Sequence, residues 1–141
     1  MRILLLNGPN LGRLGHRKPD MYGTTTLPDL VERVRAHAES RGAILLDFQS
    51  NHEGALIDRL EELDFDAVVI NPGALGHTSY ALRDAIEGID QPTVEVHISN
   101  VREREPFRHV LVLEDVVQGQ VIGRGVDGYL EAIDLLLAHP R

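Results

Sequence analysis

Short apolar runs alternate with longer stretches of helical periodicity along almost the whole sequence, and few architectures accommodate that order. Four of the runs predict strands, at 2–6, 43–48, 66–70 and 93–98, and a fifth strand is expected within 110–123. The first and third runs are almost continuously apolar, which predicts strands buried on both faces. Repeated strand–helix units therefore predict an α/β fold in which helices cover both faces of an open parallel sheet.

The stretches between these runs carry apolar stripes with helical spacing. The first stripe follows Thr26, a residue suited to an N-cap, and ends near Gly42. The stripes comprise Leu27, Leu30, Val31, Val34 and Ala38, then Ala55, Leu56, Leu60 and Leu63, then Ala81, Leu82, Ala85 and Ile86, and finally Tyr129, Leu130, Ile133, Leu136 and Leu137. Five such strands fit the flavodoxin-like order 2-1-3-4-5, in which ligands bind beyond the carboxyl ends of the strands. We expect residues 1–141 to form one flavodoxin-like catalytic domain.

Composition excludes several classes of function. The sequence has no cysteine, which removes disulfides, thiolate metal sites and a cysteine nucleophile. The formal net charge of −8 opposes binding to a phosphate backbone, so no nucleic-acid partner is expected. No apolar run approaches about 18 residues and no signal-peptide pattern precedes the first strand, so we expect a cytoplasmic protein without membrane contact. Lys18, the sole lysine, is the one candidate for amine catalysis.

Polar side chains collect after the first, third and fourth strands, and a parallel sheet brings these strand ends to one rim. They are Asn10, Arg17 and Tyr22, then Asn71 and His77, and then His97, Ser99, Arg104 and Arg108. Each cluster also has a purely structural interpretation, because Asn, Gly and Pro make turns after strands and charged runs are commonly solvated. Their coincidence favours function, since a loop of about nineteen residues without its own secondary structure is uncommon in a compact domain.

Two further patterns carry little weight. Gly123, Gly125 and Gly128 match a dinucleotide-binding fingerprint, but no further strand pattern with an acidic residue follows them. Turns and close packing before the last helix explain these glycines better. His77 and His97 lack a third ligand at a convincing spacing, so no metal is expected.

The long loop has the residues of a general-base module. An unperturbed tyrosine has a pKa of about 10, too high for a useful base at neutral pH. Arg17 precedes Tyr22 in the same loop, and a guanidinium within about 4–6 Å favours the phenolate. A local arginine effect would therefore activate Tyr22.

The fourth strand supplies a candidate acid. His97 can donate a proton to a leaving hydroxyl, with Glu95 or a backbone carbonyl fixing its tautomer and Asn71 orienting it. The remaining groups are the amides of Ile98 and Ser99 for a carboxylate, Asn10 for an oxyanion, and Arg108 for hydroxyl or carboxylate recognition. This set suits proton abstraction beside a carbonyl, followed by loss of water from a small polar acid.

Four separated blocks resemble the type II 3-dehydroquinate dehydratases, namely "NGPNL" with "GHRKPDMYG", "QSNHEG", "NPGALGHTSYALRD" and "VEVHISNVRERE". They occur in the family's order and span positions 7 to about 109. The resemblance implies a flavodoxin-like fold and a reaction without cofactor or metal. It also implies that 3-dehydroquinate loses water by trans elimination through an enolate, giving 3-dehydroshikimate in the shikimate pathway or in quinate breakdown.

The same resemblance assigns roles by motif position. The catalytic set is Tyr22 as the base, Arg17 as its activator, Asn10 as the holder of a water that stabilises the enolate, and His97 as the acid. The substrate-binding set is Asn71, His77, Asp84, Ile98, Ser99 and Arg108, while Arg104 resembles a lid arginine and Glu95 the partner of the histidine. The family is typically a dodecamer built from trimers, which implies a homo-oligomer in which Asp84 reaches a neighbouring subunit's site.

Some positions depart from the family's usual pattern. Gly12 and Arg13 follow "NGPNL", Gly76 stands where threonine is usual, and "VLVLED" replaces the customary segment at 110–115. These departures leave open a related lyase acting on another cyclic polyol acid, and a catalytically inactive flavodoxin-like binding module. A phosphorylation-receiver domain ranks last, because the first strand leads into Asn7 rather than into paired acidic residues.

Overall fold

A computed structural model describes residues 1–18, 20 and 23–138 of the chain. The strands β1 (Arg2–Asn7), β2 (Ile44–Gln49), β3 (Ala67–Asn71), β4 (Thr93–His97) and β5 (Gly119–Ile122) form one sheet in the order β2-β1-β3-β4-β5. All neighbouring strands of this sheet are parallel. The predicted flavodoxin-like fold and its strand order are therefore confirmed.

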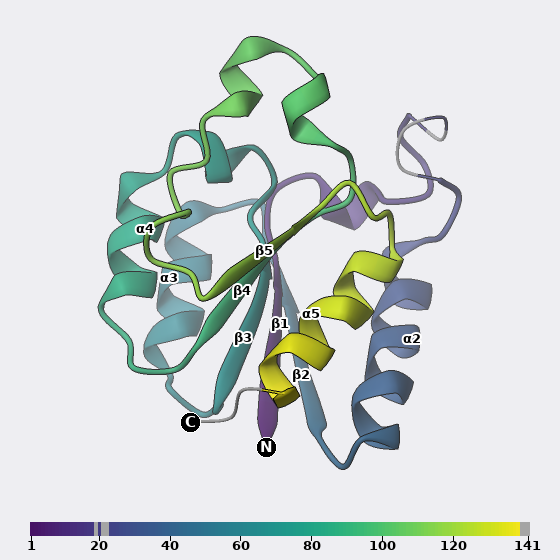
Figure 1. Ribbon diagram of the computed structural model, residues 1–141, viewed down its shortest axis with the longest axis vertical. Helices are drawn as coiled ribbons and strands as arrows, with labels where there is room; N and C mark the ends of the chain where they lie inside the picture. Colours follow the sequence, from purple (N-terminus) through teal and green to yellow (C-terminus); the bar gives the residue numbers. More distant parts are fainter. Residues whose placement is uncertain (19, 21–22, 139–141) are drawn as a thin grey trace.

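Helices cover both faces of the sheet, as the sequence predicts (Figure 1). They are α2 (Leu27–Ser40) and α5 (Asp127–Ala138) on one face, and α3 (Glu53–Glu61) and α4 (Tyr80–Glu87) on the other. Alternate side chains of β1 enter opposite cores, because successive residues of a strand point to opposite faces. Leu5 packs in the core beneath α2 and α5, whereas Leu6 packs in the core beneath α3 and α4. Burial on both faces explains why this strand is apolar without interruption.

Local signals at the helix ends agree with the expected boundaries. The Thr26 side chain accepts a hydrogen bond of 3.3 Å from the Asp29 amide and caps α2, and Gly42 follows this helix with a φ of 80°.

The prediction that Leu63 belongs to the second helical stripe is wrong, because α3 ends at Glu61 and Leu63 is 52% exposed. A regular stripe thus overestimated the length of this helix.

The fifth strand lies in the second half of the stretch 110–123, which the sequence left undecided. The first half follows an irregular path, with Leu113 fully buried in the core beneath α3 and α4. After β5, Gly123 and Gly125 adopt positive φ values of 75° and 61°. A Cβ on Gly128 would lie 3.3 Å from Val121 Cγ1. Turns and close packing therefore account for the glycine fingerprint.

The segment between β1 and α2 is anchored at its beginning. A 3-10 helix, η1 (Leu11–Arg13), follows β1, and Leu11 and Leu14 are both buried in the core that includes α2. Pro19, Met21 and the predicted base Tyr22 lie outside the described residues. Across the described part of the chain, no helix combines the length and the apolar character needed to traverse a bilayer.

Candidate active site

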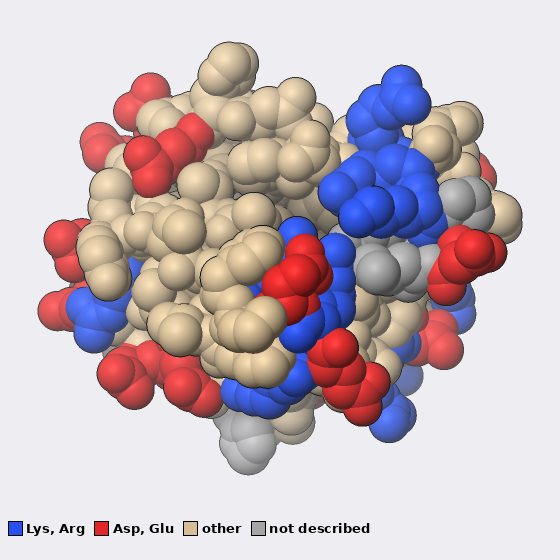
Figure 2. Space-filling view, turned by 90° about the horizontal axis from the view of Figure 1, so that it is seen from above, with Lys and Arg blue, Asp and Glu red and all other residues tan. Residues whose placement is uncertain are grey.

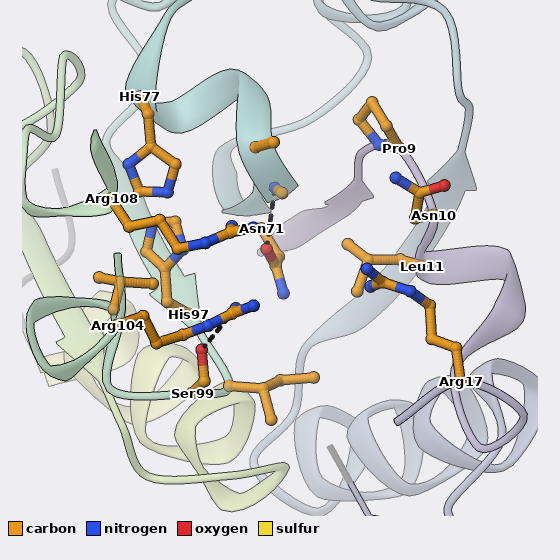
Figure 3. Close-up of a pocket in the computed structure, with 14 residues that line it drawn as sticks. Pro9, Asn10, Leu11, Arg17, Asn71, His77, His97, Ser99, Arg104 and Arg108 are labelled. Atoms are coloured by element: carbon orange, nitrogen blue, oxygen red, sulfur yellow. Dashed lines mark hydrogen bonds between the residues drawn. The ribbon is translucent and has the colours of Figure 1, made fainter. Parts of the chain in front are cut away.

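A pocket opens at the carboxyl ends of β1, β3 and β4, where the sequence places its polar clusters (Figure 3). The predicted site residues that line it are Asn10, Arg17, Asn71, His77, His97, Ile98, Ser99, Arg104 and Arg108. They come from three segments that are far apart in the chain. Parallel pairing explains the convergence, since Asn7 is in register with Asn71 and the ends of β1 and β3 lie side by side.

His97 and Glu95 form a buried pair at the end of β4. His97 Nε2 lies 2.6 Å from Glu95 Oε2, and the side chains are 5% and 0% exposed. Gln120 on β5 donates a hydrogen bond of 2.8 Å to the other oxygen of Glu95. A carboxylate only accepts hydrogen bonds, so Nε2 of His97 carries the proton on that side and Nδ1 remains for other partners. The predicted fixing of the tautomer by Glu95 is thus observed as a contact.

His77 stacks against His97, with ring centroids 5.8 Å apart. Its Nδ1 donates a hydrogen bond of 2.8 Å to the backbone carbonyl of Val110. Burial lowers the pKa of His77, and the nearby charges of His97 and Arg108 lower it further, against the hydrogen bond to Val110. A neutral His77 with a proton on Nδ1 has a lone pair on Nε2, so it can accept a hydrogen bond from a hydroxyl in the pocket.

Asn71 has partners that differ from the prediction. Its Nδ2 donates a hydrogen bond of 2.8 Å to the Tyr129 hydroxyl, and its Oδ1 accepts one of 3.1 Å from the Gly73 amide. Glu95 makes the hydrogen-bonded contact to His97, and the expected orientation of His97 by Asn71 stays a prediction. Tyr129 also donates a hydrogen bond of 2.7 Å to Asn7 Oδ1. The sequence pattern placed Tyr129 only in an apolar helical stripe. The hydroxyl group within that stripe was the one sign that this residue needs buried polar partners.

Arginine side chains give the pocket a positive surface within an acidic protein. Arg17 faces the pocket across from Arg104 and Arg108, and Lys and Arg side chains gather on the upper face of the molecule (Figures 2 and 3). Arg104 donates a hydrogen bond of 3.4 Å to Ser99 Oγ, and Arg108 pairs with Glu105 at 3.1 Å. The pocket therefore suits an anionic ligand.

The turns after β1 and β3 touch backbone to backbone. The Gly8 amide donates a hydrogen bond of 2.8 Å to the Asn71 carbonyl. A Cβ on Gly8 would lie 2.5 Å from the Pro72 carbonyl oxygen, so this close approach requires glycine. The same contact holds the "NGPN" and "NPG" segments together as the floor of the pocket.

A role for the block "QSNHEG" was missed by the sequence analysis. Gln49 Nε2 donates a hydrogen bond of 3.1 Å to the Gly8 carbonyl, and Asn51 Oδ1 accepts one of 3.0 Å from the Asn10 amide. Asn10 itself has a φ of 71°, which an asparagine tolerates better than most residues. This block therefore holds the start of the β1 loop and places Asn10 at the pocket.

The positions that depart from the family pattern lie close to the site. A Cβ on Gly76 would be 3.2 Å from both Glu95 Oε2 and His97 Cε1, and 2.8 Å from Pro72 Cγ. The altered segment that begins at Val110 supplies a carbonyl to His77, and the Val112 amide donates a hydrogen bond of 2.8 Å to the Gly76 carbonyl. This segment uses its backbone to hold residues 76–77, so its unusual side chains leave those contacts intact.

Asp84 does not belong to this pocket. It lies on α4 with its side chain 78% exposed, beside a different surface groove. Among the described residues, no group of three or more His, Asp or Glu side chains is arranged to hold a metal ion.

The sequence matches the family Dehydroquinase class II over residues 1–137. The chain belongs to this family. It is 53% identical over 134 residues to a protein of Aspergillus clavatus named catabolic 3-dehydroquinase, covering 94% of this chain and 89% of that one. It is also 53% identical over 137 residues to a 3-dehydroquinate dehydratase of Bacillus licheniformis, covering 96% and 94% of the two chains.

Solved structures of related proteins resemble this structure over almost its whole length. A type II dehydroquinase from Butyrivibrio crossotus superposes with a TM-score of 0.95 at 47% sequence identity, covering 97% of each chain. A 3-dehydroquinate dehydratase-like protein from Bifidobacterium longum gives a TM-score of 0.72 at 26% identity, covering 99% of each chain. The resemblance seen in the sequence blocks is therefore confirmed at the level of family and fold.

Proposed function

We propose that this protein is a 3-dehydroquinate dehydratase of type II, a hydro-lyase that converts 3-dehydroquinate to 3-dehydroshikimate. The observation that carries the proposal is the arrangement of the pocket, in which Arg17 and Asn10 face a buried His97–Glu95 pair. Membership of the class II dehydroquinase family supports the same activity. Relatives include proteins named catabolic 3-dehydroquinase and proteins named 3-dehydroquinate dehydratase, which fits quinate breakdown or the shikimate pathway.

The first chemical step removes a proton from carbon. The phenolate of Tyr22 takes the proton from C2, and the C–H electron pair moves into the adjacent carbonyl to form an enolate. Arg17 keeps the tyrosine ionised, because a permanent positive charge favours the phenolate. Asn10 stabilises the enolate oxygen through a water molecule.

The second step expels the hydroxyl at C1. The enolate electron pair forms the new C=C bond while His97 delivers a proton to the departing oxygen, so the hydroxyl leaves as water. Glu95 stabilises the imidazolium that serves as the donor, and a buried carboxylate does this strongly because little water screens the pair. No cofactor or metal takes part in this proposed sequence.

Substrate binding uses groups around both reacting carbons. We propose that the amides of Ile98 and Ser99 bind the carboxylate, while Arg108, His77 and Asn71 bind the hydroxyl groups. Arg104 would close over the bound substrate as a lid residue. Asp84, which does not line this pocket in its own chain, would reach the site of a neighbouring subunit.

The proposed working form is a cytoplasmic homo-oligomer, a dodecamer built from trimers, of one catalytic domain per chain. Membrane and nucleic acid have no part in this proposal, and the net charge of −8 supports the second exclusion. Light scattering on the purified protein measures the assembly, and a stable monomer would contradict it.

A related lyase acting on another cyclic polyol acid is the second candidate, because Gly76 alters the surroundings of His97. The decisive experiment incubates the purified protein with 3-dehydroquinate and follows the absorbance of the conjugated enone product. Turnover that persists after borohydride treatment would exclude an imine at Lys18. Absence of turnover with 3-dehydroquinate, but turnover of an analogue, would favour the second candidate, and binding without turnover would identify an inactive binding module.

A further inference from the structure

We propose that Tyr129 is a positioning residue, whose buried hydroxyl holds the side-chain amide of Asn71 in the orientation that binds substrate. The proposal rests on the function proposed above for Asn71. Tyr129 lies on α5, outside the pocket, and none of the chemical steps uses it. Tyr129 therefore acts on the reaction through a residue that it contacts, and of its hydrogen-bond partners Asn7 and Asn71 it is Asn71 that lines the pocket.

The contact is a short chain of buried hydrogen bonds beneath the pocket. The Tyr129 hydroxyl donates to Asn7 Oδ1 at 2.7 Å and accepts from Asn71 Nδ2 at 2.8 Å. Tyr129 is 0% exposed, Asn7 1% and Asn71 4%. The two asparagines are in register at the ends of β1 and β3, where the strand order of the sheet reverses. One hydroxyl thus joins the ends of β1 and β3 next to Asn71, which lines the pocket.

The hydrogen-bond partners of Asn71 determine the orientation of its side-chain amide. Its Oδ1 accepts from the Gly73 amide, and one of the two Nδ2 protons goes to Tyr129. The second Nδ2 proton remains for a partner in the pocket, which Asn71 lines near its centre (Figure 3). Asn71 therefore presents a donor to an oxygen of the substrate.

The direction of the Tyr129 hydroxyl follows from its protonation. Burial raises the pKa of Tyr129 well above its usual value, so the hydroxyl keeps its proton in the neutral range. That proton goes to Asn7 Oδ1, because Asn71 Nδ2 can only donate. Asn71 turned by 180° would place Nδ2 against the Gly73 amide, a donor against a donor, so Gly73 and Tyr129 together fix the orientation of the Asn71 amide.

Packing alone does not require a hydroxyl at this position. The neighbours of Tyr129 on the buried side of α5 are apolar, and they include Ala132, Ile133 and Leu136. A phenylalanine would bury the same ring in the same place. It would leave Asn7 Oδ1 and one Nδ2 proton of Asn71 without the partner they have in the native protein. The Asn71 amide would then be held by the Gly73 amide alone, which leaves it more mobile.

The test is Tyr129→Phe, measured by steady-state kinetics with 3-dehydroquinate. We expect KM to rise about five- to tenfold while kcat changes less than about threefold, because the lost interaction is made in both the ground state and the transition state. Ile133→Val is the matched control, since it lowers the thermal stability from the same helix face without touching the hydrogen-bonded chain. Equal KM values for the two variants would overturn the proposal.

A second comparison separates positioning from a general structural effect. In an Asn71→Ala background, adding Tyr129→Phe should leave KM unchanged, because Tyr129 acts through an amide that is no longer present. If the two substitutions multiply their effects on KM, Tyr129 acts by another route and the proposal fails.

The free protein gives a readout that needs no turnover. In the wild type, the side-chain amide protons of Asn71 should exchange slowly with solvent in nuclear magnetic resonance spectra, and Tyr129→Phe should accelerate that exchange at least tenfold. Unchanged exchange would contradict the positioning role. If the wild type fails to turn over 3-dehydroquinate, the proposed function falls, while this measurement still decides whether Tyr129 holds the amide.

Discussion

On the side of the pocket formed by β3 and β4, Asn71 and His97 lie on buried strand ends, whereas Asn10 and Arg17 on the opposite side lie in the segment after β1. On the strand side, His97 is held by Glu95, which Gln120 holds in turn. On the loop side, Arg17 projects from a segment that Leu14 anchors in the core. The two sides contribute different chemistry to the proposed reaction.

The two sides suit two different needs of the proposed reaction, a proton donor held in a fixed position and a base that lets substrate enter and product leave. An acid that stabilises a positive charge benefits from a buried carboxylate in a fixed position. A base on a loop can be covered when substrate binds and uncovered when product leaves. The comparison predicts that substitutions of the polar groups on the strand side damage both folding and catalysis. Substitutions of the polar groups on the loop side should damage catalysis alone, whereas Leu14 anchors the loop and also supports folding.

The largest expected effect comes from His97→Ala. It removes the proposed acid, which lowers kcat about 10²–10⁴-fold. It also leaves the buried Glu95 carboxylate without its hydrogen bond from His97, and leaving a buried charged acceptor without such a partner costs about 3 kcal/mol. Urea unfolding and kinetics on the same sample measure the two losses. Unaltered unfolding would show that the pair does not stabilise the strand side.

Tyr22→Phe should reduce catalysis as strongly and folding hardly at all. The phenyl ring remains while the proposed base is lost, so kcat falls about 10²–10⁴-fold and the free energy of unfolding changes by less than about 1 kcal/mol. Stopped-flow and steady-state assays measure the rate. A full rate with phenylalanine at this position would refute the proposed base.

Leu14→Ala tests how the loop is anchored. Leu14 is 2% exposed in the core that includes α2, and removing such a side chain costs about 2–5 kcal/mol. Loosening the segment before Arg17 should also lower kcat several-fold without changing the contacts of His97. Arg13→Ala, an exposed neighbour in the same segment, is the control and should leave the unfolding free energy within about 0.5 kcal/mol.

The smallest effect concerns the pH dependence of stability at His77. An unfolded histidine titrates near pH 6.5, and burial lowers the pKa of His77 in the folded protein. The unfolded state therefore binds more protons in this range, so this contribution to stability is present above about pH 6.5 and is lost as the pH falls toward the lower folded pKa. His77→Gln should flatten the fall in Tm between about pH 7 and 5. Parallel Tm profiles for the two proteins would contradict this assignment.

Elements with strong local signals were predicted well, and elements that depend on distant partners were not. Thr26 at the start of α2 and the apolar run of β1 are local signals, and both agree with the structure. β5 is short and only partly buried along its length, so its own residues did not locate it within 110–123. Leu63 continues the helical spacing but lies beyond the end of α3, because spacing carries no information about where a helix stops.

The alternation of strands and helices, and with it the sheet and the edge that holds the site, could be read from the sequence because periodicity is a property of each segment. Glu95 was expected as the partner of His97, but the tertiary structure alone decided the partners of Asn71 and His77. Tyr129 reaches Asn7 across 122 positions of the chain, and Val110 supplies its carbonyl to His77 across 33 positions. Such contacts depend on how separate elements pack, and no local pattern of side chains encodes that distance.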